Sequence, residues 1–360
     1  MATRSLLITG VSGYCGGTIL TNLLRTKSIT KDVQIYGLVR NEEQRAKIAD
    51  LGVTPVLFDD WDQSDQLKGI AEGFDIIIHA GAGWHPGVAK ALIAGLGKRR
   101  EQTKNDVHYL HLSGTSSLSD YPHTEGWIES RTFSDEEDIY SYLKARESRK
   151  PYMVRETDII VAEQGEFQGV QTYNIMAPTI FGIGSGLFNR YSIQIPVPAK
   201  VALESGHVSV IGNGETVWTH VHVEDLAMLF ITLLKNILQG VAIPSGKQGI
   251  YFSETGSHTH IELAQRLAKA GKELDLLKTD EVRRVTLQEA ADLWSGGVAF
   301  MTEFAHGSNA RNKAVLGRKL GWDPRHGDEW ESTFATEIAA IAANPPRSFE
   351  VPKLLEKDKS

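Results

Sequence analysis

The chain has 360 residues, of which 41% are hydrophobic and 23% charged, and its formal net charge at pH 7 is -7. This is the composition of an ordinary globular protein, and the length predicts a large domain with a smaller lobe. The acidic balance argues against nucleic acid or an anionic membrane as a partner. Cys15 is the single cysteine, so no intrachain disulfide forms, and no apolar run has the length of a bilayer span. We therefore expect a cytosolic protein.

The first half of the chain alternates short apolar runs with helical patterns, which is typical of parallel βαβ units. The predicted strands cover residues 5–9, 33–39, 54–58, 75–80, 108–113 and 171–176. Helices are predicted between them over residues 16–26, 42–51 and 87–96. These elements predict an α/β fold with a doubly wound parallel Rossmann sheet.

The predicted domain boundary follows Ile180, where the regular period stops and glycines and prolines accumulate. We assign residues 1–180 to the dinucleotide-binding domain, with a later strand and helix contributed by about 217–252. Residues 181–216 and 253–345 are assigned to a smaller C-terminal substrate-binding lobe. Residues 346–360 form a polar tail, for which we expect disorder.

A glycine-rich segment lies between the first predicted strand and the first predicted helix, with glycines at positions 10, 13 and 16. In a dinucleotide fold the first glycine permits the tight turn, the second lets backbone approach the pyrophosphate, and the third packs helix against strand. The pyrophosphate is then expected at the positive helix N-terminus. Cofactor contacts are assigned here to Gly10, Ser12, Gly13, Tyr14, Cys15 and Gly16.

The end of the second predicted strand bears on the choice between NAD and NADP. Folds that select NAD commonly place an acid there, whereas this chain has Arg40. A guanidinium suits a 2′-phosphate because it forms forked, charge-assisted hydrogen bonds. Glu42 and Glu43 follow directly and weaken this argument, and an ordinary surface arginine is the alternative. The sequence favours NADP over NAD.

In these features the sequence resembles the short-chain dehydrogenase/reductase superfamily, in its extended or atypical branch of epimerase/dehydratase-like proteins. The resemblance rests on the glycine spacing, on residues 58–60 and 78–82 after the third and fourth strands, and on residues 218–227. It implies that an acid at 59 or 60 meets the adenine amino group and that the turn at 78–82 runs under the nicotinamide ribose. Further cofactor contacts are accordingly assigned to Asp59, Asp60, His79, Ala80, Gly81, Ser113, Pro178, Thr179 and Ile180.

The resemblance also implies an active site of a serine or threonine, a tyrosine and a lysine. After the fifth strand Thr115 is assigned to hold the substrate oxygen, with Ser116 as the next choice. Tyr140 and Lys144 form a Tyr-x-x-x-Lys pattern one helical turn apart, and they are assigned to proton transfer.

One observation speaks against that assignment. The interval from Lys144 to the strand near 176 is longer than the superfamily usually has. Residues 155–164 look more like the helix that should carry the motif, and Tyr152 is the nearest tyrosine. Glu156, and no lysine, stands four residues after it. A modified site that uses Tyr152 therefore stays open, as does a site without a tyrosine acid.

We expect an NADP(H)-dependent oxidoreductase that reduces a carbonyl, imine or activated alkene of a small organic metabolite, with secondary metabolites included. The alternatives are a nucleotide-sugar epimerase or dehydratase with bound NAD, a catalytically silent dinucleotide-sensing regulator, and a non-redox cyclase or isomerase. The epimerase alternative predicts cations for a diphosphate, with Arg190, Lys200 and Arg311 as candidates. The aromatic residues Trp84, Phe188, Tyr191 and Trp218 are candidates for the wall of the substrate pocket, and they would make this pocket apolar.

Two further expectations concern metals and partners. His220 and His222 share one face of a predicted strand, but no third ligand stands at a suggestive spacing, so no metal site is expected. The expected partner is a small-molecule substrate, and the resemblance allows a homodimer.

Overall fold

The computed structural model describes residues 3–345 and is built around a seven-stranded sheet in which all pairings are parallel. In spatial order its strands are β11 (Ile250–Phe252), β7 (Gln171–Ala177), β5 (His108–Gly114), β4 (Ile76–His79), β1 (Arg4–Thr9), β2 (Val33–Val39) and β3 (Thr54–Leu57). The chain moves outward in opposite directions from β1 and from β4. Such a switch in direction opens a crevice at the carboxyl ends of the strands, where ligands of doubly wound sheets bind.

The central strands are apolar on both faces, as a sheet covered by helices on both sides requires. In β1, Leu6 and Ile8 face one hydrophobic cluster while Leu7 faces the other. The same alternation places Ile77 opposite its two neighbours in β4. These near-continuous apolar runs explain why the predicted strands agree with the observed ones to within one or two residues at either end.

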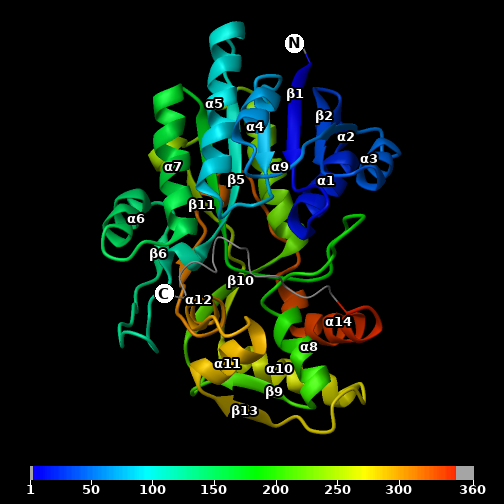
Figure 1. Cartoon of the computed structure of the whole chain (residues 1–360), viewed down its shortest axis with the longest axis vertical. Helices are drawn as coiled ribbons and strands as arrows, with labels where there is room; N and C mark the ends of the chain where they lie inside the picture. Colours follow the sequence, from blue (N-terminus) through cyan, green and yellow to red (C-terminus); the bar gives the residue numbers. More distant parts are fainter. Residues whose placement is uncertain (1–2, 346–360) are drawn as a thin grey trace.

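Helices cover both faces of this sheet (Figure 1). One face carries α4 (Ser64–Ala71), α5 (Pro86–Thr103) and α7 (Met153–Gln168), and the other carries α1 (Tyr14–Arg25) and α9 (Val223–Leu238). The shorter helices are α2 (Lys27–Thr30), α3 (Glu42–Ala49) and α6 (Ile139–Glu147). The helix predicted over 87–96 continues to Thr103 in the structure. The prediction ended too early because the last turns of the helix are polar and exposed and so carry no apolar period.

A second lobe lies beyond the carboxyl ends of the parallel strands (Figure 1). Its small sheets contain β8 (Thr179–Phe181), β10 (Val217–His222) and β12 (Gly256–Thr259), then β9 (Val208–Ile211) with β13 (Val282–Val285), then β6 (Phe133–Ser134) with β14 (Asn312–Lys313). Its helices are α8 (Pro196–Ser205), α10 (His260–Glu273), α11 (Leu287–Trp294), α12 (Ala299–His306) and α14 (Trp330–Ala343), whereas the short α13 (Leu316–Lys319) packs against α9 and β11 of the large domain. A separate hydrophobic cluster of α8, α10 and α14 stabilises this lobe.

Residues 217–252 contribute α9 and β11 to the large sheet and its cover, while β10 pairs with β8 and β12 outside it. The division at residue 180 itself stays a prediction. The tail predicted over 346–360 lies outside the described residues. Within residues 3–345, no helix combines the length and the apolar character that crossing a bilayer demands.

Candidate active site

The turn between β1 and α1 requires glycine at two positions for different reasons. Gly10 has a φ of +72°, and a Cβ there would lie 2.6 Å from the carbonyl carbon of Ala80. A Cβ on Gly16 would lie 2.2 Å from the carbonyl oxygen of Gly10. Any side chain at either position therefore forces backbone apart. The predicted spacing of the glycines thus corresponds to a turn packed directly against the backbone that follows β4.

The N-terminus of α1 has no group of its own to satisfy its first N–H groups. Gly13 is the N-cap, no side chain caps the helix, and the first turn holds no acidic residue. An anion at this end is stabilised by the free N–H groups and by the helix dipole. Two features thus fit a dinucleotide pyrophosphate: a cradle that side chains would fill, and an uncapped helix end facing it.

The two side chains that follow Gly13 begin the walls of a cavity of about 500 Å³, which we call the inner cavity. Tyr14 is buried, and its Oη donates to the carbonyl oxygens of Phe181 and Gly182 at 3.0 and 2.6 Å. Cys15 also lines this cavity, and burial raises the pKa of its thiol to about 12. The thiol is therefore a neutral packing group rather than a nucleophile.

Arg40 lies at the end of β2 and lines a second, larger cavity of about 1360 Å³, which we call the outer cavity. Ser12 from the glycine turn lines it too, with Asn41, Gln44 and Lys47 of the next helix and its cap. The Arg40 side chain is exposed and makes no ion pair within residues 3–345. Its backbone N–H donates to the Gln44 side chain. The guanidinium is thus available to an anionic group bound beside Ser12.

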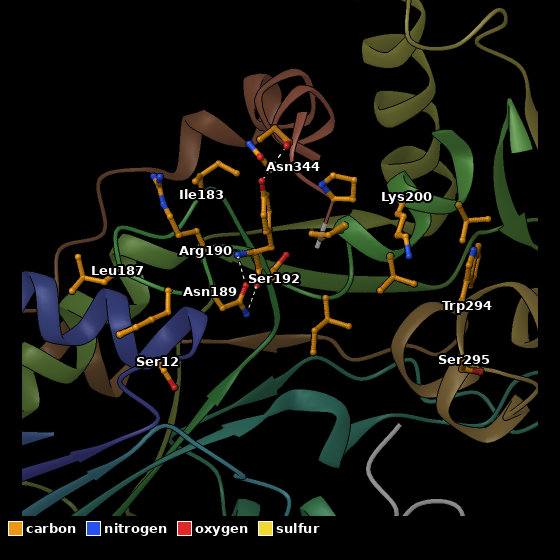
Figure 2. Close-up of a pocket in the computed structure, with 18 of the residues that line it drawn as sticks. Ser12, Ile183, Leu187, Asn189, Arg190, Ser192, Lys200, Trp294, Ser295 and Asn344 are labelled. Atoms are coloured by element: carbon orange, nitrogen blue, oxygen red, sulfur yellow. Dashed lines mark hydrogen bonds between the residues drawn. The ribbon is translucent and has the colours of Figure 1, made fainter. Parts of the chain in front are cut away.

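A loop after β8 separates the two cavities. Figure 2 shows its residues Asn189 and Ser192 between Ser12 and Lys200, and both line the two cavities alike. The backbone N–H of Asn189 donates to the carbonyl oxygen of Ser12 at 3.2 Å, so the loop touches the glycine turn directly. Arg190 closes the loop on itself through a 2.6 Å hydrogen bond to the Gly184 carbonyl oxygen.

The acids predicted to meet adenine lie outside both cavities. Asp59 and Asp60 are exposed; Asp59 accepts a hydrogen bond from Gln66 of α4, and Asp60 accepts one from the backbone N–H of Asp62 in the same loop. Trp61, directly after them, lies against the turn below β4, where a Cβ on Gly81 would come within 3.1 Å of its ring. The predicted contact of Asp59 or Asp60 with a cofactor stays a prediction.

The turn after β4 divides into one residue that faces the inner cavity and one that does not. Ala80 lines the cavity, as predicted. His79, the last residue of β4, is fully buried, and its Nδ1 lies 2.7 Å from Thr9 Oγ1. Burial holds the pKa of His79 well below the usual value. Its assignment as a cofactor contact is corrected: the alternation of side chains along β4 turns His79 into the core.

The ends of β5 and β7 supply the opposite wall of the inner cavity. Ser113, Pro178 and Ile180 line it, and their predicted contact with the cofactor stays a prediction. Thr179 lies between the last two residues and is fully buried without reaching either cavity. Its assignment is corrected for the same reason as that of His79, because neighbouring residues of a strand point to opposite faces.

Tyr140 and Lys144 do not reach either cavity. They lie on α6, which Figure 1 shows at the edge of the molecule beyond α7. Tyr140 Oη donates to Glu163 Oε1 of α7 at 2.6 Å, and Lys144 Nζ donates to the same oxygen at 2.9 Å. Burial and this carboxylate raise the pKa of Tyr140. The predicted pair is therefore corrected: it is a helix-to-helix contact on the outside.

Tyr152 and Ser116 occupy the place in which the predicted pair was expected. Both line the inner cavity, and Tyr152 Oη donates to Ser116 Oγ at 3.0 Å. Tyr152 is the N-cap of α7, the helix that packs beside β5 and β7. Thr115 begins the turn after β5 but is fully buried and lies outside the cavity, so its assignment passes to Ser116.

Two charged residues beneath Tyr152 were not predicted. Arg155 is fully buried, and its guanidinium carbon lies 5.5 Å from the centre of the Tyr152 ring. Asp158, one turn further on, faces the hydroxyls of Ser113 and Ser117, and burial raises its pKa to about 7. The sequence contained a signal for these two residues. Arg155 and Asp158 stand three and six residues after Tyr152, so they share one face of a helix whose other residues on that face are apolar.

Comparison with known sequences gives this arrangement a family. The profile of the NAD dependent epimerase/dehydratase family matches residues 6–243. The chain belongs to this family. That confirms the resemblance inferred from the glycine turn, and it supports binding of a nicotinamide dinucleotide, NAD or NADP.

Among curated relatives of this family member, one from Acremonium sp named Oxidase ucsJ is 25% identical over 338 residues, which cover 89% of this chain and 93% of the relative. An uncharacterized protein of Schizosaccharomyces pombe is 24% identical and covers 94% of this chain and 99% of its own length.

Solved structures of the family confirm the fold of this epimerase/dehydratase relative. The dTDP-glucose 4,6-dehydratase DesIV of Streptomyces venezuelae, with NAD bound, superposes with a TM-score of 0.64 at 17% identity, covering 94% of this chain and 97% of that one. A UDP-glucose 4-epimerase of Thermotoga maritima gives 0.60 at 12% identity, covering 95% and 100%. At such identities the likeness concerns the fold alone.

Proposed function

We propose that this family member is an NADP(H)-dependent oxidoreductase that reduces a carbonyl, imine or activated alkene of a small organic molecule. The observation that carries the proposal is the 3.0 Å hydrogen bond from Tyr152 Oη to Ser116 Oγ, at the wall of the inner cavity. A phenol and a hydroxyl side by side are suited to hold a substrate oxygen and to give it a proton.

The cofactor is proposed from the residues around the two cavities. The uncapped end of α1 would hold the pyrophosphate, and Ala80, Ser113 and Pro178 would border the nicotinamide. Arg40, with Lys47 nearby, supports a 2′-phosphate in the outer cavity and hence NADP over NAD. When bound, the nicotinamide would supply or accept the hydride.

The chain's own residues would handle the proton. Burial raises the pKa of Tyr152 to about 12, so at neutral pH its phenol is a proton donor. As Tyr152 gives up its proton, the buried Arg155 guanidinium, 5.5 Å from the ring, stabilises the resulting phenolate. Arg155 thus takes the electrostatic part of the lysine that this chain lacks at position 156, where Glu156 is exposed. Ser116 would orient the substrate oxygen.

A nucleotide-sugar epimerase or dehydratase with bound NAD is the second candidate, and one observation favours it. Arg190 and Lys200 both line the outer cavity, as a diphosphate would require. Arg311, the third candidate cation, lies elsewhere and donates to the Glu129 carbonyl oxygen. The Acremonium relative is named an oxidase, which supports the first proposal, an oxidoreductase, over the epimerase.

The test is NADPH oxidation in single turnovers with a panel of carbonyl, imine and enone compounds, for the wild type, Tyr152→Phe and Tyr140→Phe. We expect Tyr152→Phe to slow the chemical step by about 10²–10⁴-fold, the range for loss of a general acid. Tyr140→Phe removes the same hydroxyl from α6 and should leave the rate unchanged. NAD retained through purification would favour the epimerase, and tight NADPH binding without any turnover would favour a regulator.

A further inference from the structure

The inner cavity has walls of aromatic rings that come from both the large domain and the second lobe. Trp84, Tyr152, Trp218, Trp294 and Phe304 line it. Tyr152 and Phe304 stack with ring centres 4.3 Å apart and planes 11° from parallel. Trp218 is almost fully buried, and its Nε1 donates to Ser308, so only the apolar body of the indole remains for a ligand. The cavity therefore offers flat apolar faces.

Among residues 3–345, no aspartate, glutamate, lysine or arginine lines the inner cavity. His306 also lines it, and burial lowers the pKa of that imidazole to about 3, so it is neutral at physiological pH. Moving an ion from water into such surroundings without a partner costs several kcal/mol. The cations that a diphosphate would need, Arg190 and Lys200, line the outer cavity instead.

The polar groups that remain in the inner cavity are neutral. Ser192 Oγ is buried and has no hydrogen-bond partner within residues 3–345. Gln194 already donates to the Ala305 carbonyl oxygen. Together with Ser116 and Tyr152, these groups suit a ligand with a few neutral oxygen atoms on an otherwise apolar frame.

We propose that the substrate is an uncharged aromatic ketone, held between the aromatic rings of the inner cavity with its carbonyl oxygen at Tyr152 and Ser116. The reduction of the ketone rests on the proposed function, whereas the binding of the ketone rests only on the lining of the inner cavity. It departs from the nucleotide sugars named for the solved structures of the family, because a diphosphate placed in this cavity would meet no cation.

The test measures binding by quenching of tryptophan fluorescence, with NADP⁺ present at saturation so that the ketone binds without being reduced. The probes are 2-acetylnaphthalene, its carboxylate-bearing analogue 6-acetyl-2-naphthoate, and UDP-glucose. We expect the neutral ketone to bind at least about 100-fold more tightly than the carboxylate, because the charge must be desolvated. Comparable or tighter binding of the carboxylate or of UDP-glucose, or no binding of the ketone, overturns the proposal.

A matched pair of variants assigns the selectivity to the cavity. Met301→Lys adds a cation to the cavity wall, and we expect it to reduce or reverse the preference for the neutral ketone. Met228→Lys adds the same charge at an exposed position of α9, outside the cavity, and should change nothing. An unaltered preference in Met301→Lys contradicts the proposal. Ketone binding without reduction would refute the proposed function alone, whereas reduction of anionic ketones in preference would refute this inference alone.

Discussion

At the scale of single residues, the candidate site combines a tyrosine with an unusual cation. Arg155 lies one helical turn after Tyr152 and is fully buried, with its Nε donating to the Ser117 carbonyl oxygen at 2.9 Å. A guanidinium is planar and always charged, so it holds a fixed position where a flexible lysine would sample several. Asp158 beside it titrates near neutral pH, with a pKa raised by burial to about 7. The site thus keeps its charges in a second layer and presents neutral hydroxyls to the cavity.

Arg40 carries the prediction that belongs to this scale. Replacing it with alanine removes the guanidinium that would pair with a 2′-phosphate, a charge-assisted contact of about 1.5–3 kcal/mol. We expect Arg40→Ala to weaken NADPH binding by about 10–100-fold and to leave NADH binding nearly unchanged. Fluorescence titration with the two cofactors measures both.

Arg45→Ala is the matched control for that titration. Arg45 lies on α3, the helix that begins two residues after Arg40, pairs with Glu42 at 3.1 Å, and does not line the outer cavity. Its removal should affect neither cofactor. An equal loss of NADPH and NADH affinity in Arg40→Ala would show that the arginine contacts the adenine or ribose rather than a phosphate.

At the scale of elements, the contact between the glycine turn and its neighbours defines the cofactor site. α1 packs against α9 on one face of the sheet, and the loop after β8 crosses its first turns. A Cβ on Gly186 of that loop would lie 2.8 Å from the Cα of Gly17. Two glycines facing each other allow the loop to approach the helix without any side chain between them. This close packing leaves no room for displacement of the turn.

We therefore expect Gly16→Ala to destabilise the protein and to abolish dinucleotide binding. Its Cβ would lie 2.2 Å from the Gly10 carbonyl oxygen, which is backbone and has to move. Overpacking of this kind costs about 1–3 kcal/mol in the free energy of unfolding. Urea unfolding and cofactor titration measure the two effects.

Gly69→Ala provides the comparison for that variant. Gly69 lies in α4, and a Cβ there meets nothing within 4 Å. Because alanine favours a helix over glycine, this substitution should leave stability unchanged or raise it by up to about 1 kcal/mol. If Gly16→Ala behaves like Gly69→Ala, the turn is more open than the structure shows.

At the scale of the whole molecule, the second lobe closes the crevice at the strand ends and gives the inner cavity part of its aromatic wall. The lobe and the sheet also enclose several buried histidines that have no ion-pair partner within residues 3–345. Burial is the main cause that lowers the pKa of seven of them: His79, His108, His111, His220, His258, His260 and His306. In the unfolded chain each takes up a proton near pH 6.5. In the folded chain burial lowers the pKa to about 4 for His108, His111, His220 and His260 and to about 3 for His306, and it holds the pKa of His79 and His258 well below the usual value.

This difference predicts sensitivity to acid. As the pH falls from 6.5 towards 4, the unfolded state binds more protons than the folded state, so the free energy of unfolding decreases by about 1.4 kcal/mol per pH unit for each such histidine. Six acids within residues 3–345 act in the opposite direction, because burial raises their pKa and the folded state binds their protons first. The pKa is raised to about 7 for Asp158 and Glu337, and it is raised also for Asp120, Asp135, Glu147 and Glu254. The histidines outnumber them, so the net effect is loss of stability.

The urea midpoint should therefore fall steeply between pH 6.5 and 4.5. His108→Gln should make the slope shallower by about one proton, because the pKa of His108 is lowered to about 4 in the folded chain. A midpoint that stays constant over this range would mean that the histidines are protonated in the folded state.

The sequence by itself determined the fold and the class of cofactor. Strands buried on both faces appear as apolar runs such as residues 76–79, and a turn that admits only glycine fixes glycine at positions 10 and 16. Both signals are local, because they arise from backbone and burial rather than from distant partners. The spacing of a tyrosine and a lysine is local too, but it says nothing of the direction in which their helix faces.

Only the tertiary structure decided which tyrosine reaches the cavity and what surrounds it. Tyr140 is turned away because α6 packs outside α7, whereas Tyr152 begins the helix that lies against β5 and β7. The aromatic wall includes Trp294 and Phe304, which follow Tyr152 by more than a hundred positions in the chain. Helix packing brings these residues together through burial of apolar area, a force without direction that leaves no spacing rule in the sequence.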